Sequence, residues 1–119
     1  MSGIKIEPFC DYNVQKCSLG RHKWSIPRLV ELSKDLEVFE IPLRHLNIYQ
    51  SYDKMTLREL VGHIMSVQAA NLDYPIILDE DGDLMDGRHR IMRAILEGRE
   101  AIKAVRFESN PRPCEIEEA

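Results

Sequence analysis

The stretch YPIILDEDGDLMDGRHRIMRAILEG, residues 74–98, decides the fold. Its apolar run at 75–79 is typical of a short buried strand, and the acidic turn that follows contains Asp-Gly, a strong hairpin signal. A second short strand is expected at Leu84-Met85. A helix pattern then runs from Arg88 to about Glu97, and Gly98 stands where glycine often ends a helix. The stretch therefore predicts a hairpin followed directly by a helix.

The segment Asp86-Gly87-Arg88-His89-Arg90 lies where that helix is expected to begin. A helix N-terminus exposes backbone N–H donors and carries roughly +0.5 charge, so anions bind well there. Gly87 has no Cβ, so a ligand can approach the backbone closely. Basic side chains at this end oppose the helix dipole, and a bound phosphate would relieve that repulsion. We therefore predict that Gly87, Arg88, His89 and Arg90 bind a phosphate group.

The rest of this helix leaves an alternative open. Its apolar residues share one broad face, which should pack inward: Ile91, Met92, Ala94, Ile95 and Leu96. The opposite arc carries His89, Arg90, Arg93 and Glu97. The alternative interpretation is a solvated face with an Arg93–Glu97 ion pair, worth about 0.3–0.5 kcal/mol. The glycine, the conflict with the dipole and the preceding Asp86 favour the anion site.

Two side chains in the motif are candidates for chemistry. Asp86 could orient an acceptor hydroxyl as general base, or bind Mg²⁺ together with the phosphates. The alternative for Asp86 is a turn or N-cap carboxylate. His89 could donate to a phosphate oxygen or stabilise charge during phosphoryl transfer, and its alternative is an exposed helix histidine.

Composition narrows the class of protein. A chain of 119 residues with 44% hydrophobic and 30% charged residues is expected to form one globular domain. The net charge of −4 argues against general nucleic-acid binding, whereas a local cationic pocket suits a small anionic ligand. No apolar run approaches the roughly 20 residues that cross a bilayer, and residues 1–9 lack the apolar core of a signal peptide.

The three cysteines, Cys10, Cys17 and Cys114, are an odd number and lie near the ends of the chain. Their spacing resembles neither a disulfide framework nor a zinc site. Thiols of a cytoplasmic protein are the favoured interpretation, so a cytoplasmic localisation without membrane contact is expected.

Further elements are expected upstream of the hairpin. Ser25 could cap a helix that starts at Ile26-Pro27. The alternation at 37–41 is typical of a strand, and Pro42 marks its end. Thr56 and Glu59 form a capping box ahead of an amphipathic helix. Its apolar arc is expected to pack in the core: Leu57, Leu60, Val61, Ile64, Met65 and Val67.

The domain organisation follows from these elements. Residues 1–21 show no clear period and are expected to form an irregular N-terminal arm. The domain itself is expected over 22–108, with a last strand at 102–107. Residues 109–119 are rich in proline and glutamate, so a flexible acidic tail is expected there.

The order of these elements resembles the ParB/sulfiredoxin superfamily over about residues 36–107. In ParB N-terminal domains the comparable segment reads G-E-R-R-x-R-A-A-x-x-x-G, and residues 87–98 have the same length. Gly87, Arg90, Ala94 and Gly98 match that pattern. The Asp-Gly-x-His-Arg form found in sulfiredoxin-like and free-serine-kinase-like members is closer. The resemblance implies an α+β single domain, with packed helices on a small mixed sheet, whose loop holds the phosphates of a nucleotide.

Departures from the family pattern remove some activities. Sulfiredoxins carry a nucleophilic cysteine where this chain has Arg88, so sulfinic acid reduction is not expected. The sequence ends about a dozen residues after the last expected strand, without length for helix-turn-helix and dimerisation regions, so a complete ParB role is not expected. In the kinase-like branch an N-terminal glutamate acts as base, which makes Glu40 a further catalytic candidate.

Three functions remain open. The first is an enzyme that uses ATP, ADP or CTP, with Mg²⁺, to transfer phosphate to a small molecule or to hydrolyse the nucleotide. The second is a non-catalytic nucleotide sensor that acts through a protein partner. The third is a DNA-associated ParB-like nuclease or partition accessory protein, although no clear metal-carboxylate cluster supports it.

Overall fold

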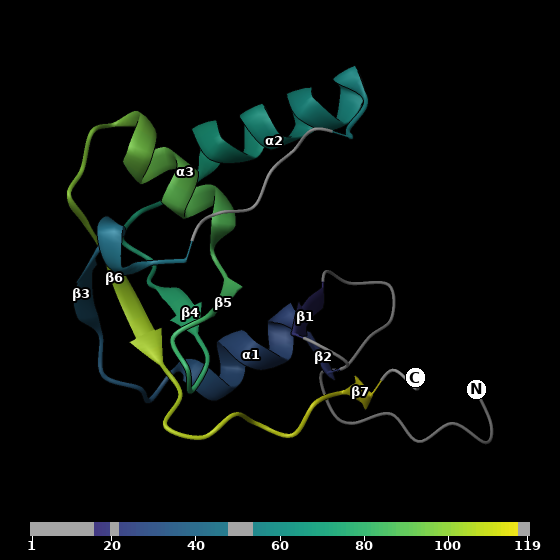
Figure 1. Cartoon of the computed structure of the whole chain (residues 1–119), viewed down its shortest axis with the longest axis vertical. Coiled ribbons are helices and arrows are strands. Elements are labelled where there is room, and N and C mark those ends of the chain that lie inside the picture. Colours follow the sequence, from purple (N-terminus) through teal and green to yellow (C-terminus); the bar gives the residue numbers. More distant parts are fainter. Residues whose placement is uncertain (1–15, 20–21, 48–53, 117–119) are drawn as a thin grey trace.

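The computed structural model describes residues 16–19, 22–47 and 54–116 (Figure 1). Within these ranges the chain forms an α+β domain with three α-helices and two small sheets. The α+β class predicted from the sequence is therefore confirmed.

The larger sheet contains four strands in the order β3-β6-β4-β5. Strand β3 spans Phe39–Pro42, β6 spans Ala101–Arg106, β4 spans Ile76–Leu78 and β5 spans Leu84–Asp86. Strands β4 and β6 run parallel, while the other neighbours are antiparallel. The sheet is thus mixed, as expected, and β5 ends at an edge immediately before Gly87.

The smaller sheet joins the two ends of the described chain. Strand β1 (Lys16–Leu19) pairs with β2 (His22–Ser25), which pairs on its other side with β7 (Glu115–Ile116). The indole N–H of Trp24 donates to the Pro111 carbonyl at 2.8 Å. The predicted irregular arm is therefore wrong for β1, and the predicted flexible tail is wrong for β7. Residues 1–15 of the expected arm lie outside the described residues.

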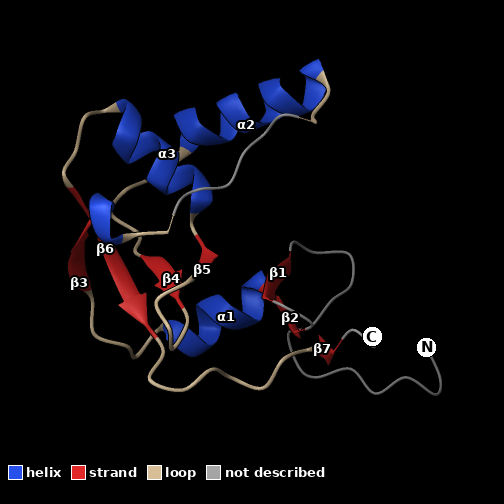
Figure 2. Ribbon diagram, in the orientation of Figure 1, coloured by secondary structure: helices blue, strands red, loops and turns tan. Residues whose placement is uncertain are grey.

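The helices begin close to their expected positions. Helix α1 spans Ile26–Ser33, α2 spans Leu57–Ala69 and α3 spans Arg88–Leu96, with a short 3-10 helix, η1, at Leu43–His45. The Ser25 hydroxyl accepts from the Arg28 N–H, and the Thr56 hydroxyl accepts from the Glu59 N–H. Figure 2 shows α1 on one side of the larger sheet and α2 with α3 on the other.

Two apolar clusters cover the two faces of the larger sheet. Side chains alternate along a strand, so Ile77 of β4 packs with Leu29 of α1, while Ile76 and Leu78 pack with Ile91 of α3. Within α3 itself only Ile91 and Ala94 are buried, so its inward face is narrower than predicted. The sheet therefore holds α1 and α3 on opposite faces, with the β5–α3 junction at its edge.

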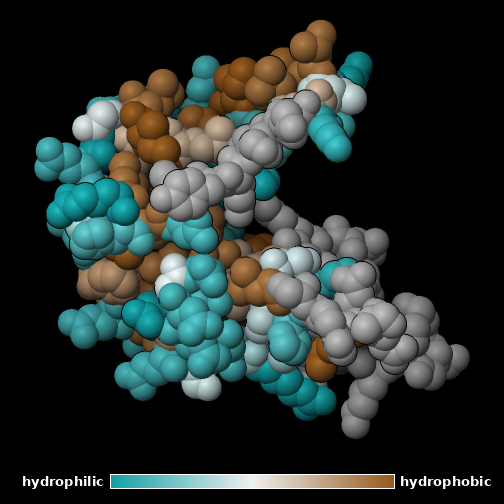
Figure 3. All heavy atoms as spheres, in the orientation of Figure 1, coloured by the Kyte–Doolittle hydropathy of each residue, from teal (hydrophilic) through white to brown (hydrophobic). Residues whose placement is uncertain are grey.

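Helix α2 departs from the expectation that its apolar arc lies in the core. Of that arc only Val67 is buried, and five apolar side chains are exposed: Leu57, Leu60, Val61, Ile64 and Met65. Figure 3 shows hydrophobic side chains gathered over this helix. The helix packs mainly on α3, so only a narrow side of it is covered. The prediction that this arc is core is wrong.

The cysteines also differ from the prediction. Cys17 is buried and unbonded, whereas Cys114 is disulfide-bonded. The interpretation of all three cysteines as thiols is therefore wrong for Cys114. Disulfides are rare in proteins of the reducing cytosol, so this bond does not favour the predicted cytoplasmic localisation. None of the described helices has the length and apolar character needed to span a bilayer.

Candidate functional site

A cavity of about 930 Å³ lies beside the β5 edge of the larger sheet, between α1 and the α2–α3 pair. Its walls come from α1, from the C-terminal end of α2, and from the β5–α3 junction. Figure 3 shows the molecule hollowed between α2 and α1. All five motif residues line it: Asp86, Gly87, Arg88, His89 and Arg90. The sequence motif and the cavity therefore coincide.

The first turn of α3 has no side-chain cap. Gly87 occupies the N-cap position with φ 118° and ψ 19°, so no N-cap side chain accepts from the first-turn N–H groups. No acidic residue lies in this turn, which contains Arg88, His89 and Arg90. Backbone donors at the positive end of the helix dipole thus lie in the wall of the cavity.

Packing against the core explains why position 87 is a glycine, which the sequence alone did not reveal. A Cβ built on Gly87 would lie 2.4 Å from Cγ2 of Ile76, and the positive φ also disfavours other residues. The missing side chain therefore makes room for the core residue Ile76. The expectation that it makes room for a ligand has no support in this geometry.

Arg90 is held by the protein itself. Its guanidinium donates to the carbonyl oxygens of Tyr74 and Pro75 and to Oδ2 of Asp86, the last at 2.8 Å. Both side chains of the Arg90–Asp86 pair are mostly buried. Asp86 ends β5 and is not the N-cap, so its carboxylate serves first as the partner of Arg90. Arg88 and His89 are the other two basic side chains of the motif that line the cavity.

His89 has a partner that sequence analysis missed. Nε2 of His89 lies 2.8 Å from Nδ1 of His63, which comes from α2. The two ring centroids are 5.1 Å apart. Burial lowers the pKa of His89 from its ordinary value, and the nearby charges of Arg88 and His63 lower it further. His89 is half-buried, so the alternative of an exposed helix histidine is wrong. His63 lies four positions before the buried Val67, about one turn along α2, but no sequence signal links His63 to α3.

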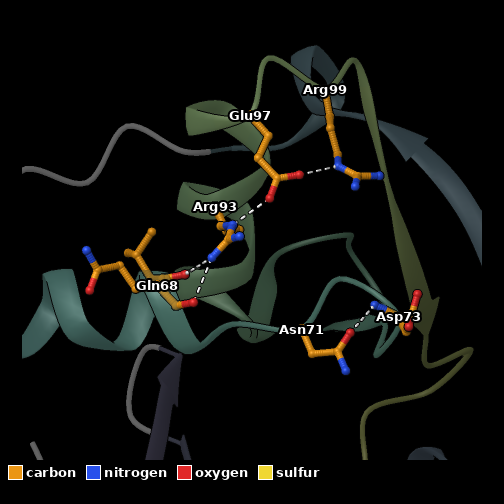
Figure 4. A network of polar contacts seen from close by, with 7 residues as sticks. Gln68, Asn71, Asp73, Arg93, Glu97 and Arg99 are labelled. Carbon is orange, nitrogen blue, oxygen red and sulfur yellow. Dashed lines mark hydrogen bonds and ion pairs between the residues drawn. The ribbon is translucent and has the colours of Figure 1, made fainter.

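The outer end of α3 fits the alternative interpretation. Arg93 forms an ion pair with Glu97 and donates to the carbonyl oxygens of Val67 and Gln68 at the end of α2 (Figure 4). Glu97 also accepts from Arg99. The predicted Arg93–Glu97 pair is therefore confirmed. Arg93 also ties α3 to the C-terminal end of α2.

The remaining candidates do not gather at the cavity. Glu40 is exposed on β3, at the opposite edge of the sheet from Asp86 on β5, so the structure does not bring it to the site. Cys17 lines the cavity, but burial raises the pKa of its thiol to about 12, which leaves it a poor nucleophile. Among the described residues, no group of three or more His, Cys, Asp or Glu side chains could hold a metal ion.

No protein-family model, curated protein or solved structure matches this chain. The resemblance to the ParB/sulfiredoxin superfamily therefore stays a prediction.

Proposed function

We propose that the chain binds a nucleotide in this cavity, with the phosphate groups against the start of α3. The observation that carries the proposal is the uncapped first turn of α3, which lies in the cavity wall beside Arg88 and His89. Phosphate oxygens could accept from the backbone N–H groups there and neutralise the basic side chains. The resemblance of this loop to nucleotide-binding ParB-like loops points to the same ligand.

The size and lining of the cavity favour a nucleotide over free phosphate. Its volume of about 930 Å³ lies at the upper end of the range of about 300–1,000 Å³ for small-molecule sites. The wall opposite α3 includes the apolar Val30, Leu36 and Val38, together with Ser33 and Lys34. Tyr74 also lines the cavity and is mostly exposed, so its ring is accessible for stacking. One end thus suits phosphates and the other suits a nucleoside.

Phosphoryl transfer is the reaction that such a site could support. It depends mainly on positioning and on neutralising charge at the phosphoryl oxygens, which Arg88, His89 and the helix N-terminus could supply. Mg²⁺ is often bound by only one or two carboxylates together with the phosphates of the ligand. Asp86 is the carboxylate placed for that role, and the ion would supply further charge neutralisation there.

One observation favours a second candidate, a nucleotide sensor without catalysis. One carboxylate oxygen of Asp86 already accepts from Arg90 at 2.8 Å, so it is not open to take a proton from an acceptor hydroxyl. Such a protein would bind the nucleotide and signal through a protein partner without forming product. Nothing in the described residues favours the DNA-associated nuclease.

The test is a thermal-shift titration with ATP, ADP and CTP, each with and without Mg²⁺. We expect at least one nucleotide to raise the melting temperature, because a ligand that binds only the folded state stabilises it. The Arg88→Ala variant should lose this response. The matched control, Arg99→Ala, removes the same charge beyond the far end of α3 and should keep it. No shift with any nucleotide would refute the proposal, and measurable product formation would exclude the sensor.

A further inference from the structure

His63 and His89 meet at the contact between α2 and α3. His89 lines the cavity, whereas His63 is not part of the cavity wall. The 2.8 Å separation joins Nδ1 of His63 to Nε2 of His89, so one of these nitrogens donates a proton and the other accepts it. At least one ring must therefore be neutral for the contact to exist. Nδ1 is then the nitrogen of His89 that remains for a ligand.

The direction of this hydrogen bond decides what His89 offers to the cavity. If the Nδ1–H of His63 donates, a neutral His89 accepts at Nε2 and must carry its own proton on Nδ1. That N–H is the donor an oxyanion requires. If the pair takes up one more proton, His89 can donate from both nitrogens and becomes a cation beside the anion. In both cases His63 determines which nitrogens of the His89 ring carry protons, without itself touching the ligand.

We propose that His63 is a positioning residue of the anion site, which holds the His89 ring with Nδ1 available to a phosphate and shares the proton that the pair takes up when the phosphate binds. This inference rests on the proposed nucleotide binding and adds a regulation of it by protons. Nucleotide affinity should therefore rise as the pH falls.

The charges around the pair support this coupling. From α3, Arg88 opposes a proton on His89, as does burial of the ring, while Asp86 of β5 favours that proton. Arg93 lies one turn beyond His89 on α3 and is bonded to Glu97 and to the end of α2. Glu59 lies one turn before His63 on α2 and is exposed. Without a ligand these effects together lower the pKa of His89. The negative charge of a bound phosphate would raise that pKa again.

The experiment counts protons on binding. Calorimetric titrations of the full chain with ATP and Mg²⁺, at pH 6, 7 and 8 in buffers of different ionisation enthalpy, give the number of protons taken up. The wild type should gain up to tenfold in affinity per pH unit between 8 and 6, the limit for one proton. His63→Asn keeps an amide near the Nδ1 position but cannot share a proton. It should take up fewer protons than the wild type when ATP binds at pH 6, and its affinity should change less between pH 8 and pH 6.

Controls separate the possible outcomes. His63→Leu removes the hydrogen bond and should weaken binding at every pH, whereas His45→Asn, at an exposed histidine outside the cavity, should behave as the wild type. Titration of the ligand itself cancels because every variant meets the same ATP. Equal proton uptake in the wild type and His63→Asn would overturn this inference and leave nucleotide binding intact. Absence of ATP binding by a folded wild type would overturn both.

Discussion

Helices α2 and α3 both carry an apolar face, but they begin and pack in opposite ways. Helix α2 begins with a side-chain cap, Thr56, and has the acidic Glu59 in its first turn, while most of its apolar face is exposed. Helix α3 begins on Gly87 with no side-chain cap and only basic side chains in its first turn, yet it buries Ile91 and Ala94 in the core. The N-terminus of α2 is satisfied by its own residues, whereas that of α3 is better matched to an external anion.

The difference shows what the sheet contributes. Helix α3 follows β5 directly and packs on the sheet through Ile91, so its first turn is fixed at the edge of the cavity. Helix α2 packs on α3 and is tied to it by Arg93 and by the His63–His89 contact. One helix is thus positioned by the core, and the other by polar contacts with the first. The predictions below test this contrast, starting with the largest effect.

The glycines of the two helices should respond to alanine with opposite sign. Gly87→Ala would place a Cβ 2.4 Å from Ile76 at a positive φ, so we expect a loss of about 3 kcal/mol in the free energy of unfolding. Gly62 lies within α2, and apart from the backbone of its own helix and its chain neighbours nothing lies within 4 Å of the Cβ position. Gly62→Ala should therefore stabilise the protein by about 0.5–1 kcal/mol. Urea unfolding measures both, and a tolerated Gly87→Ala would contradict the close contact.

The arginines of the two helices should differ in the same way. Arg90→Ala removes three hydrogen bonds and leaves Asp86 mostly buried without its partner, so we expect a loss of about 2 kcal/mol. Arg58 is exposed on α2, and Arg58→Ala should change stability by less than about 0.5 kcal/mol. Chemical unfolding without ligand provides the comparison. If Arg90→Ala kept full stability and lost only nucleotide response, Arg90 would be a ligand residue instead.

The sequence predicted the elements well because their signals are local. The apolar run of β4, the Asp-Gly turn, the Thr56 cap and Gly98 at the end of α3 each act through neighbours in the chain. Gly98 has the positive φ of 72° that this position favours. The motif at 86–90 was also local, and the structure places all of it in the cavity wall.

Contacts between distant residues could not be predicted from the sequence. Gly87 is required because a side chain there would clash with Ile76 on the neighbouring strand β4. The partners of Arg90 include carbonyl groups 15 and 16 residues earlier in the chain. The hydrogen bond between His63 and His89 joins positions 26 residues apart. Periodicity showed that α2 has an apolar face but not whether another element covers it. Each of these depends on how elements pack, which a single sequence does not encode in any local pattern.

The contact between α2 and α3 should weaken in acid. The pKa of His89 is lowered in the folded chain, so the unfolded chain binds more protons below the ordinary value of 6.5. This contribution to stability is constant above that pH and is lost as the pH falls through 6.5 towards the folded-state pKa. The melting temperature of the ligand-free protein should drop over that window. His89→Gln should remove this part of the drop, and an unchanged profile in the variant would show that His89 does not cause it.

The smallest effect is expected on the outer face of α2. Leu57 is 83% exposed, so Leu57→Gln should change the free energy of unfolding by less than about 0.5 kcal/mol. Ile91 on α3 is only 2% exposed, so Ile91→Ala should lower the free energy of unfolding by about 3 kcal/mol. Urea unfolding at several protein concentrations measures both. A loss above 1 kcal/mol for Leu57→Gln would mean that another part of the chain, or another molecule, covers this face in solution. The contrast between a helix held by the core and a helix held by polar contacts would then no longer hold.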